Sequence, residues 1–179
     1  MESPAGDLFT ACMLGDVPAA RSALLAGADV NWRNSRGMTA LLVACGGMGP
    51  PAMLDLLLSA GARVDAADES GWTPLIFVAS SGQLPLLRLL TQHGADVHAR
   101  AAERGWQPLT RAAYRGHAAA VEALLQAGAD ATAATEGKTA LQWAQQGGHA
   151  AVVAVLAERT GRAEQAVELE TDARVMQEC

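Results

Sequence analysis

The side chains best suited to chemistry in this chain of 179 residues are four histidines and three cysteines. No two histidines lie three or four positions apart, the spacing that brings two imidazoles to one helix face to bind a metal. No two cysteines have the spacing of a zinc site, and an odd number does not build a disulfide framework. The sequence also pairs no nucleophile with a base. We therefore predict a protein that is not an enzyme, with no catalytic, metal-binding or cofactor-binding residues.

The overall composition narrows the range of partners. The formal net charge is −6, which argues against nucleic acid, because nucleic-acid binding needs a concentrated positive patch. No apolar run approaches the roughly 18 residues of a membrane span, and the first residues lack the basic and apolar pattern of a secretory signal. We expect a soluble cytoplasmic protein, with the nucleus as a second location, and neither nucleic acid nor a membrane as partner.

The elements that position these side chains repeat along the chain. Gly-Ala pairs begin at Gly27, Gly61, Gly94 and Gly128, and a second set of glycines stands at Gly37, Gly71, Gly105 and Gly137. Both sets recur about every 33 residues. Two independent markers with one period indicate repeated structural units, not a single irregular core.

The segment 71–93 shows how one unit folds. Thr73 suits a helix N-cap, Pro74 suits the first helical position, and Gly82 can adopt the left-handed conformation that ends a helix. These signals predict one helix over 74–81 and a second over 84–93. Two such short helices cannot bury their apolar faces alone, so neighbouring units must stack to complete the core.

The motifs of these units resemble the ankyrin-repeat family. They are "GWTPL" at 71–75, "GH" at 116–117 and 148–149, and "GADV" at 27–30 and 94–97. The resemblance implies an all-α ankyrin-repeat solenoid of stacked helix pairs, with β-hairpin fingers beside a concave face. After an N-terminal extension over 1–5, the repeat domain covers 6–160, in five repeats: 6–35, 36–69, 70–103, 104–136 and 137–160.

Several segments depart from the regular period. The second repeat has one extra residue between its helices, where Pro51 follows Pro50 and these prolines are expected to start the second helix. The finger before the fourth repeat is one residue longer than those before it, and the finger before the fifth is shorter. The acidic tail 161–179 breaks the period and is expected to be a frayed helix or disordered.

The resemblance also implies roles for single residues. In the family, a histidine after the turn glycine ties the turn between helices together, so His117 and His149 are expected to be structural. Cys12 and Cys45 occupy equivalent positions on stacked helices, too far apart for a disulfide, and are expected to be small core residues. Asn31 stands where ankyrin proteins can be hydroxylated by an asparaginyl hydroxylase; the alternative is that its side chain only bonds the finger backbone.

Residues beside the finger glycines and at the exposed ends of the first helices are expected to contact a partner. The set contains aromatic residues and arginines, which dominate interface energetics: Arg36, Met38, Trp72, Arg100, Arg104, Trp106, Tyr114 and Arg115. Two alternatives stand beside this hypothesis. The tryptophans could stack on neighbouring fingers and stiffen the array, and the arginines could pair with Asp68, Glu69 or Glu103. Trp143 is expected to belong to the core.

These observations favour a monomeric, non-enzymatic module that binds a protein partner through its concave face and fingers. The arginine and aromatic residues of the third and fourth repeats would attract an acidic segment of that partner. The alternative is a regulatory or targeting subunit that acts through its acidic tail, with the repeats as an anchor.

Overall fold

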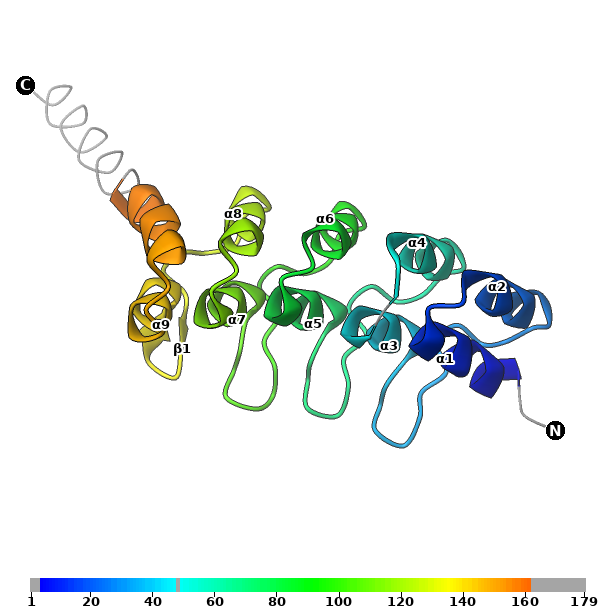
Figure 1. The fold of residues 1–179 in the computed structure, drawn as a ribbon. Helices are drawn as coiled ribbons and strands as arrows, with labels where there is room; N and C mark the ends of the chain where they lie inside the picture. Colours follow the sequence, from blue (N-terminus) through cyan, green and yellow to red (C-terminus); the bar gives the residue numbers. More distant parts are fainter. Residues whose placement is uncertain (1–3, 48, 162–179) are drawn as a thin grey trace, which may run out of the picture.

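The computed structural model describes residues 4–47 and 49–161, which form five helix pairs stacked side by side (Figure 1). The first helices of the pairs are α1 (Pro4–Leu14), α3 (Ala40–Gly46), α5 (Pro74–Ser81), α7 (Pro108–Arg115) and α9 (Ala140–Gln146). The second helices are α2 (Val17–Leu25), α4 (Pro51–Ser59), α6 (Leu84–Gln92) and α8 (Ala118–Gln126), followed by helical residues 150–161. The loops between repeats extend from the row of first helices, away from the second helices (Figure 1).

The third repeat confirms the local signals in its sequence. The side chain of Thr73 accepts a hydrogen bond from the backbone N–H of Ile76 at 3.4 Å, and Pro74 is the first residue of α5. Gly82 ends this helix with φ of +69°. The expected start of the second helix in repeat two is also confirmed, because Pro50 caps α4 and Pro51 begins it.

The ends of the repeat domain differ in part from the prediction. Helix α1 begins at Pro4, inside the segment that the sequence assigned to an N-terminal extension. A proline is well suited to the first turn of a helix, where its missing N–H costs nothing. At the other end the helix that starts at 150 continues to residue 161, and the rest of the predicted acidic tail lies outside the described residues.

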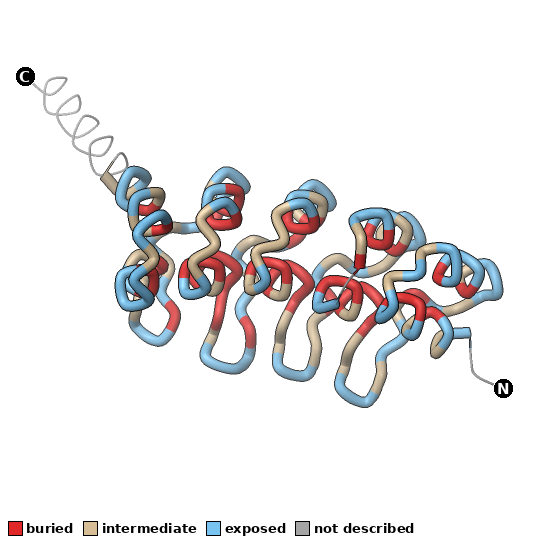
Figure 2. Tube along the Cα trace, viewed as in Figure 1, coloured by how far each residue is buried: buried red, intermediate tan, exposed pale blue. Residues whose placement is uncertain are grey.

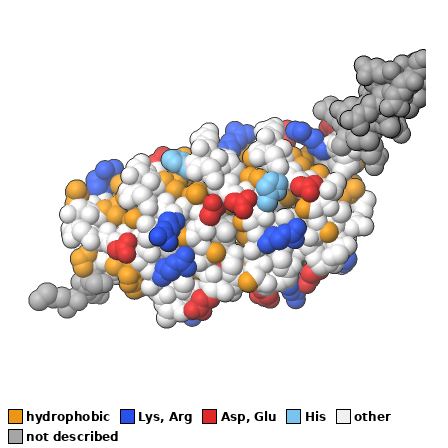
Figure 3. Space-filling model, turned by 180° about the vertical axis from the view of Figure 1, so that it is seen from behind, with side chains coloured by type: hydrophobic (Ala, Val, Ile, Leu, Met, Phe, Trp, Pro, Cys, Tyr) orange, Lys and Arg blue, Asp and Glu red, His pale blue; other side chains and the backbone are white. Residues whose placement is uncertain are grey.

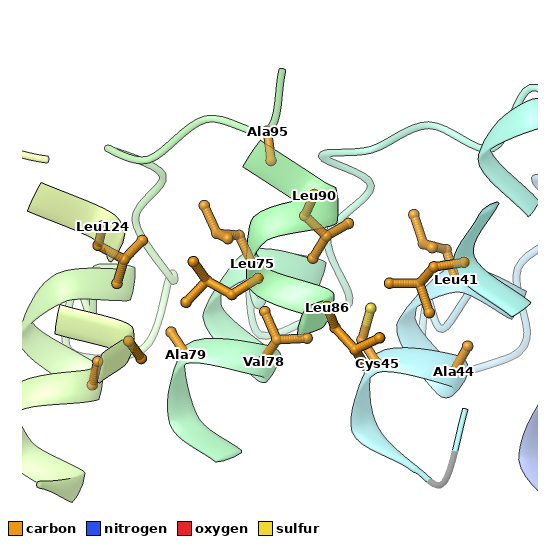
Figure 4. Close-up of a cluster of buried hydrophobic side chains, with 14 of the residues drawn as sticks. Leu41, Ala44, Cys45, Leu75, Val78, Ala79, Leu86, Leu90, Ala95 and Leu124 are labelled. Atoms are coloured by element: carbon orange, nitrogen blue, oxygen red, sulfur yellow. The ribbon is translucent and has the colours of Figure 1, made fainter. Parts of the chain in front are cut away.

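The core is a continuous stack of small and branched side chains. Leu41, Leu75 and Leu109 occupy equivalent positions on consecutive first helices and are almost fully buried. Side chains of α3, α5 and α6 point toward one another between the repeats (Figure 4). Buried segments follow the first helices and the facing sides of the second, whereas the finger tips are exposed (Figure 2). Each first helix packs against the next, so every repeat depends on its neighbours for burial.

The fingers are not all β-hairpins in the strict sense. Within the described residues, strands pair only in the last finger, where β1 (Ala134–Thr135) lies antiparallel to β2 (Lys138–Thr139). Its turn consists of Glu136 and Gly137, both with positive φ, the geometry of a two-residue hairpin turn that matches strand twist. The longer fingers close with one or two backbone hydrogen bonds and no paired strands, such as the bond from the N–H of Asp68 to the carbonyl oxygen of Trp72 at 3.1 Å. The predicted hairpins are therefore corrected to one short hairpin and three tight loops.

The histidines after the turn glycines have a structural role, as expected, and their bonds reach the preceding repeat. A ring nitrogen (Nε2) of His117 lies 3.1 Å from the carbonyl oxygen of Ser80, and that of His149 lies 3.0 Å from the carbonyl oxygen of Tyr114. In repeat three Gln83 takes the equivalent position and donates from its side-chain amide to the carbonyl oxygen of Cys45 at 3.3 Å. Each of these side chains thereby gives a hydrogen-bond partner to a carbonyl oxygen near the C-terminal end of the first helix in the preceding repeat.

The two cysteines of the helix stack are buried free thiols, which confirms their assignment to the core. The thiol of Cys12 lies 3.8 Å from the sulfur of Met53, toward which it donates a weak hydrogen bond. Burial raises the pKa of Cys12 to about 12 and raises that of Cys45 further. Both thiols therefore stay protonated near neutral pH.

Candidate binding surface

A hollow between repeats three, four and five brings together several of the predicted partner-binding residues. It has a volume of about 250 Å³ and we call it the aromatic hollow. Its lining consists of Trp72, Glu103, Arg104, Trp106, Arg111, Tyr114 and Trp143. Four of these, the two finger tryptophans, Arg104 and Tyr114, were predicted from the sequence.

The floor of the aromatic hollow is a packed set of rings. Trp106 follows the glycine of the third finger, and its ring centroid lies 5.1 Å from that of Trp143 and 5.4 Å from that of Tyr114. Tyr114 and Trp143 meet edge to face at 5.5 Å. The exposed fraction is 5% for Trp106 and 7% for Trp143, against 41% for Tyr114. The burial of Trp106 therefore supports the alternative in which this ring stacks within the array, and it forms the floor of the hollow. Tyr114 forms part of the rim and is accessible to a partner.

Arg111 of α7 is the cation of this hollow. Its guanidinium carbon lies 5.0 Å from the ring centroid of Trp72, 5.1 Å from that of Trp106 and 5.5 Å from that of Tyr114. Its Nε donates a hydrogen bond to the hydroxyl of Ser80 at 3.1 Å. Contact with three electron-rich ring faces orients the guanidinium without neutralising it.

The surroundings of Arg111 favour the arrival of a negative charge. Burial, followed by repulsion from Arg115, lowers the pKa of Arg111, and Arg104 adds to the repulsion while Tyr114 opposes it. None of the described carboxylates forms an ion pair with Arg111. Among the described residues, the site therefore has a positive charge that is oriented by rings and has no ion-pair partner.

The other predicted arginines in this region differ in their contacts. Arg104 pairs with the carboxylates of Glu103 at 3.9 Å and Glu136 at 3.6 Å, so the alternative of an arginine paired with a finger acid holds for this residue. Arg100 does not line the hollow and donates to the carbonyl oxygen of Ala134 at 3.3 Å. Arg115 donates from Nε to the carbonyl oxygen of Ser80 at 3.4 Å.

Two further predicted residues, Arg36 and Met38, line a second hollow, which we call the apolar hollow. It has a volume of about 440 Å³ and lies over the first three repeats. Its other lining residues are Phe9, Met13, Asn34, Val43, Gly46, Gly47 and Phe77. The ring of Phe77 packs on that of Trp72 at 5.1 Å, so one aromatic contact links the two hollows. Together they form a surface along the first helices and fingers, which we call the finger face.

Sequence reasoning missed Arg111 and Phe77, and it missed that Trp143 lines the hollow. A signal for them existed in the repeat alignment. Val43, Phe77, Arg111 and Trp143 stand at one position in four consecutive repeats, with the same spacing as the finger glycines. An arginine in a position otherwise filled by apolar residues indicates a local need for charge.

Asn31 forms a cross-repeat contact at the base of its finger. Its side-chain amide donates to the carbonyl oxygen of Gly61 at 3.0 Å, and its side-chain oxygen accepts from the backbone N–H of Arg63 at 2.9 Å. Asp65 repeats half of this arrangement by accepting from the backbone of Asp96 at 2.9 Å. These bonds support the alternative in which the residue at this position ties the finger backbone together.

The described part of the chain shows no sign of a metal or membrane site. It contains no group of three histidine, cysteine or acidic side chains that could hold a metal ion. None of its helices combines the length and the apolar character needed to cross a bilayer. On the side opposite to the view of Figure 1, acidic and basic side chains are interspersed instead of forming one large charged area (Figure 3).

Comparison with known proteins identifies the repeats. A family model described as "Ankyrin repeats (3 copies)" matches residues 8–101 and 98–167. The RelA-associated inhibitor of Mus musculus is 36% identical over 92 residues, which are 51% of this chain and 11% of that protein. The B-cell lymphoma 3 protein homolog of Mus musculus is 43% identical over 79 residues, or 44% of this chain and 17% of that protein. Delta-latroinsectotoxin-Lt1a of Latrodectus tredecimguttatus is 33% identical over 98 residues, or 52% of this chain and 8% of that protein. The matched part is thus less than a fifth of each relative.

Proposed function

The chain belongs to the ankyrin-repeat family, and from this premise we propose that it is a non-enzymatic module that binds another protein along its finger face. Ankyrin repeats generally mediate interactions between proteins. Fold alone does not fix function, so the proposal depends on the surface.

The observation that carries the proposal is the pair of linked hollows on the finger face. They are lined by aromatic, methionine and arginine side chains, the residue types that are enriched at protein interfaces. Met13 is 57% exposed and Tyr114 is 41% exposed, so both large side chains are accessible to a partner. A partner that covers them would gain apolar burial at both hollows.

We further propose that the module regulates its partner by masking or recruiting it, as a monomer in the cytoplasm or the nucleus. One relative is named an inhibitor associated with RelA, which supports a regulatory role of this kind. The matched repeats are 11% of that relative, so its own partner is not transferred to this chain.

The test begins with affinity capture from the native cell and mass spectrometry, which supplies a partner for quantitative binding. Tyr114→Ala should then weaken binding by about 2 kcal/mol or more, roughly thirtyfold in Kd, because the exposed ring loses its contact area. The matched control is Leu25→Ala, which removes a side chain that is 83% exposed at the end of α2. Equal loss in both variants, or no loss in Tyr114→Ala, would place the interface elsewhere.

Charge at the rim of the finger face supplies a second readout. Arg115 is exposed, so Arg115→Glu should weaken binding mainly at low salt, where screening does not suppress exposed charges. A salt-independent effect would indicate that the substitution acts through the fold.

The alternative function assigns the work to the acidic tail. Residues 161–179 contain five acids and two arginines, which is half of the net charge of the chain. Deletion of 161–179 separates the two proposals. Unchanged partner capture favours the finger face, whereas lost capture with the repeats still folded favours the tail.

A separate proposal concerns modification of Asn31 by an asparaginyl hydroxylase. The side chain is engaged with Gly61 and Arg63, so the enzyme would have to open the base of this finger to reach it. Co-expression with such a hydroxylase should raise the mass of the peptide that contains Asn31 by one oxygen. An unchanged mass would reject the proposal and leave the structural role.

A further inference from the structure

We propose that the finger face binds an extended acidic peptide segment, in which Arg111 holds a carboxylate at the aromatic hollow and an apolar side chain fills the apolar hollow. This inference rests on the proposed function and adds to it the chemistry of the partner. The residue that would bind the anion, Arg111, was not among the partner-binding residues predicted from the sequence.

Arg111 is prepared for an anion by its contacts. Three rings hold its guanidinium at 5.0 to 5.5 Å from their centroids, and Nε is bonded to Ser80. The two terminal nitrogens form no hydrogen bond to any described residue. Because Nε is engaged, the edge formed by the two terminal nitrogens remains, and its two N–H groups match the two oxygens of a carboxylate. Because the aromatic contacts already restrict the side chain, little conformational entropy is lost when the carboxylate arrives.

The acids among the described residues form no ion pair with Arg111. Glu103 lines the same hollow, but it pairs with Arg104, and so does Glu136. Arg104, Arg111 and Arg115 together thus outnumber these two carboxylates, and neither carboxylate forms an ion pair with Arg111. Arg115 adds a second positive charge on the same helix, four residues further along. The uncompensated charge is positive within a chain of net charge −6, which selects an acidic ligand over a basic one.

The distance between the two hollows predicts the spacing of the peptide. Arg111 belongs to α7. In the apolar hollow, Val43 lies on α3 and Met38 lies just before it, two repeats away from α7. Neighbouring helices pack about 8–10 Å apart, so the two positions are roughly 20 Å apart along the stack. An extended chain covers about 3.3 Å per residue. The segment should therefore place its acid and its large apolar residue about six positions apart.

The test uses a random peptide library of defined length, so that the ligand chemistry is selected and not assumed. The full chain is presented to a phage-displayed library of twelve-residue peptides. Selected peptides should be enriched in Asp or Glu about six positions from Leu, Ile, Met or Phe. A synthetic copy of a selected peptide then provides the probe for titration.

A double-mutant cycle locates the carboxylate. Arg111→Gln in the protein, or the acid changed to its amide in the peptide, should each weaken binding at least tenfold. Both changes together should weaken it little further, because they remove the same contact. Arg88→Gln is the matched control, since it removes an exposed arginine from α6 and should leave binding unchanged. Arg111→Lys keeps the charge without the fork and should give an intermediate loss, provided circular dichroism shows the same helicity.

Four other results would count against the inference. Selected peptides without acidic enrichment, or with equal affinity for wild type and Arg111→Gln, would overturn the inference while the proposed function survives. Peptides whose binding is insensitive to both Arg111→Gln and Tyr114→Ala would contradict the proposed function as well. Self-association that disappears in Arg111→Gln would show a second copy as the occupant and would also overturn the inference. A library that yields no binding peptide counts against it too.

Discussion

Replacement of Trp106 by alanine tests whether the aromatic hollow is built on a packed floor. The side chain is 5% exposed and lies under Arg111 while it contacts Trp143 and Tyr114. Removal of a buried tryptophan lowers the free energy of unfolding by about 3–5 kcal/mol. Because two aromatic pairs worth about 0.5–1.5 kcal/mol each are lost with it, we expect a value in the upper half of that range. Trp106→Phe, which retains a ring, should lose much less.

Urea denaturation followed by circular dichroism measures this loss. The control is Trp32→Ala, since Trp32 is 40% exposed and its ring meets that of Phe9 edge to face at 6.0 Å; it should lose about 1 kcal/mol or less. A loss below about 1 kcal/mol in Trp106→Ala, or equal losses in the two variants, would refute the packed floor. If Trp106 also anchors a partner, Trp106→Ala should weaken binding by about 2 kcal/mol or more. That loss must be measured at urea concentrations below the unfolding transition, where the variant is still folded.

Three other predictions concern a turn glycine, a buried thiol and the end of a helix. Gly116→Ala should lower the free energy of unfolding by about 1–3 kcal/mol more than Gly128→Ala: both have positive φ, but a new methyl meets a histidine ring at 2.6 Å only at Gly116, and equal urea midpoints would contradict this. Cys12 should resist thiol reagents in the native state at pH 8 and react in urea. The folded pKa of Cys12 is about 12 and exceeds the unfolded value of about 8.5, so burial of the protonated thiol contributes its full stability below pH 8.5 and loses it as the pH rises toward 12. Peptide mapping after labelling shows whether Cys12 has reacted. Amide hydrogens over 45–53 should exchange faster than those over 80–87, because the glycine-rich insertion weakens the end of its helix; equal protection would mean that the insertion has been misinterpreted.

The helix pairs could be predicted from the sequence because their signals are local. A capping threonine, a proline at the first helical position and a left-handed glycine each act within a few residues, so Thr73, Pro74 and Gly82 sufficed for α5. The period then fixed how the pairs stack. Strand pairing was overestimated because it depends on the turn geometry, and only the shortest finger has the two-residue turn that brings β1 and β2 into register.

The charge pattern of the surface was harder to predict, because it depends on contacts between repeats. Arg104 was compared with acids of its own finger, yet its shorter ion pair is with Glu136, at 3.6 Å. These two residues precede the finger glycines of consecutive repeats, so stacking places them side by side. In the long third finger, Arg100 donates to the backbone of Ala134 and does not line the aromatic hollow.

In a stacked array the informative unit is therefore the set of residues at one position in successive repeats. Such a set faces one line of the surface, and a change of residue type within it marks where that line changes its chemistry. At the position of Val43 and Phe77 the chain has an apolar side chain, whereas the next repeat has Arg111. Glu103 ends the third repeat and Glu136 ends the fourth; both form ion pairs with Arg104, and neither pairs with Arg111. This line of residues is apolar in the second and third repeats and cationic in the fourth, so it has a direction. A peptide that fits it must therefore present its apolar residue and its acid in the same spatial order.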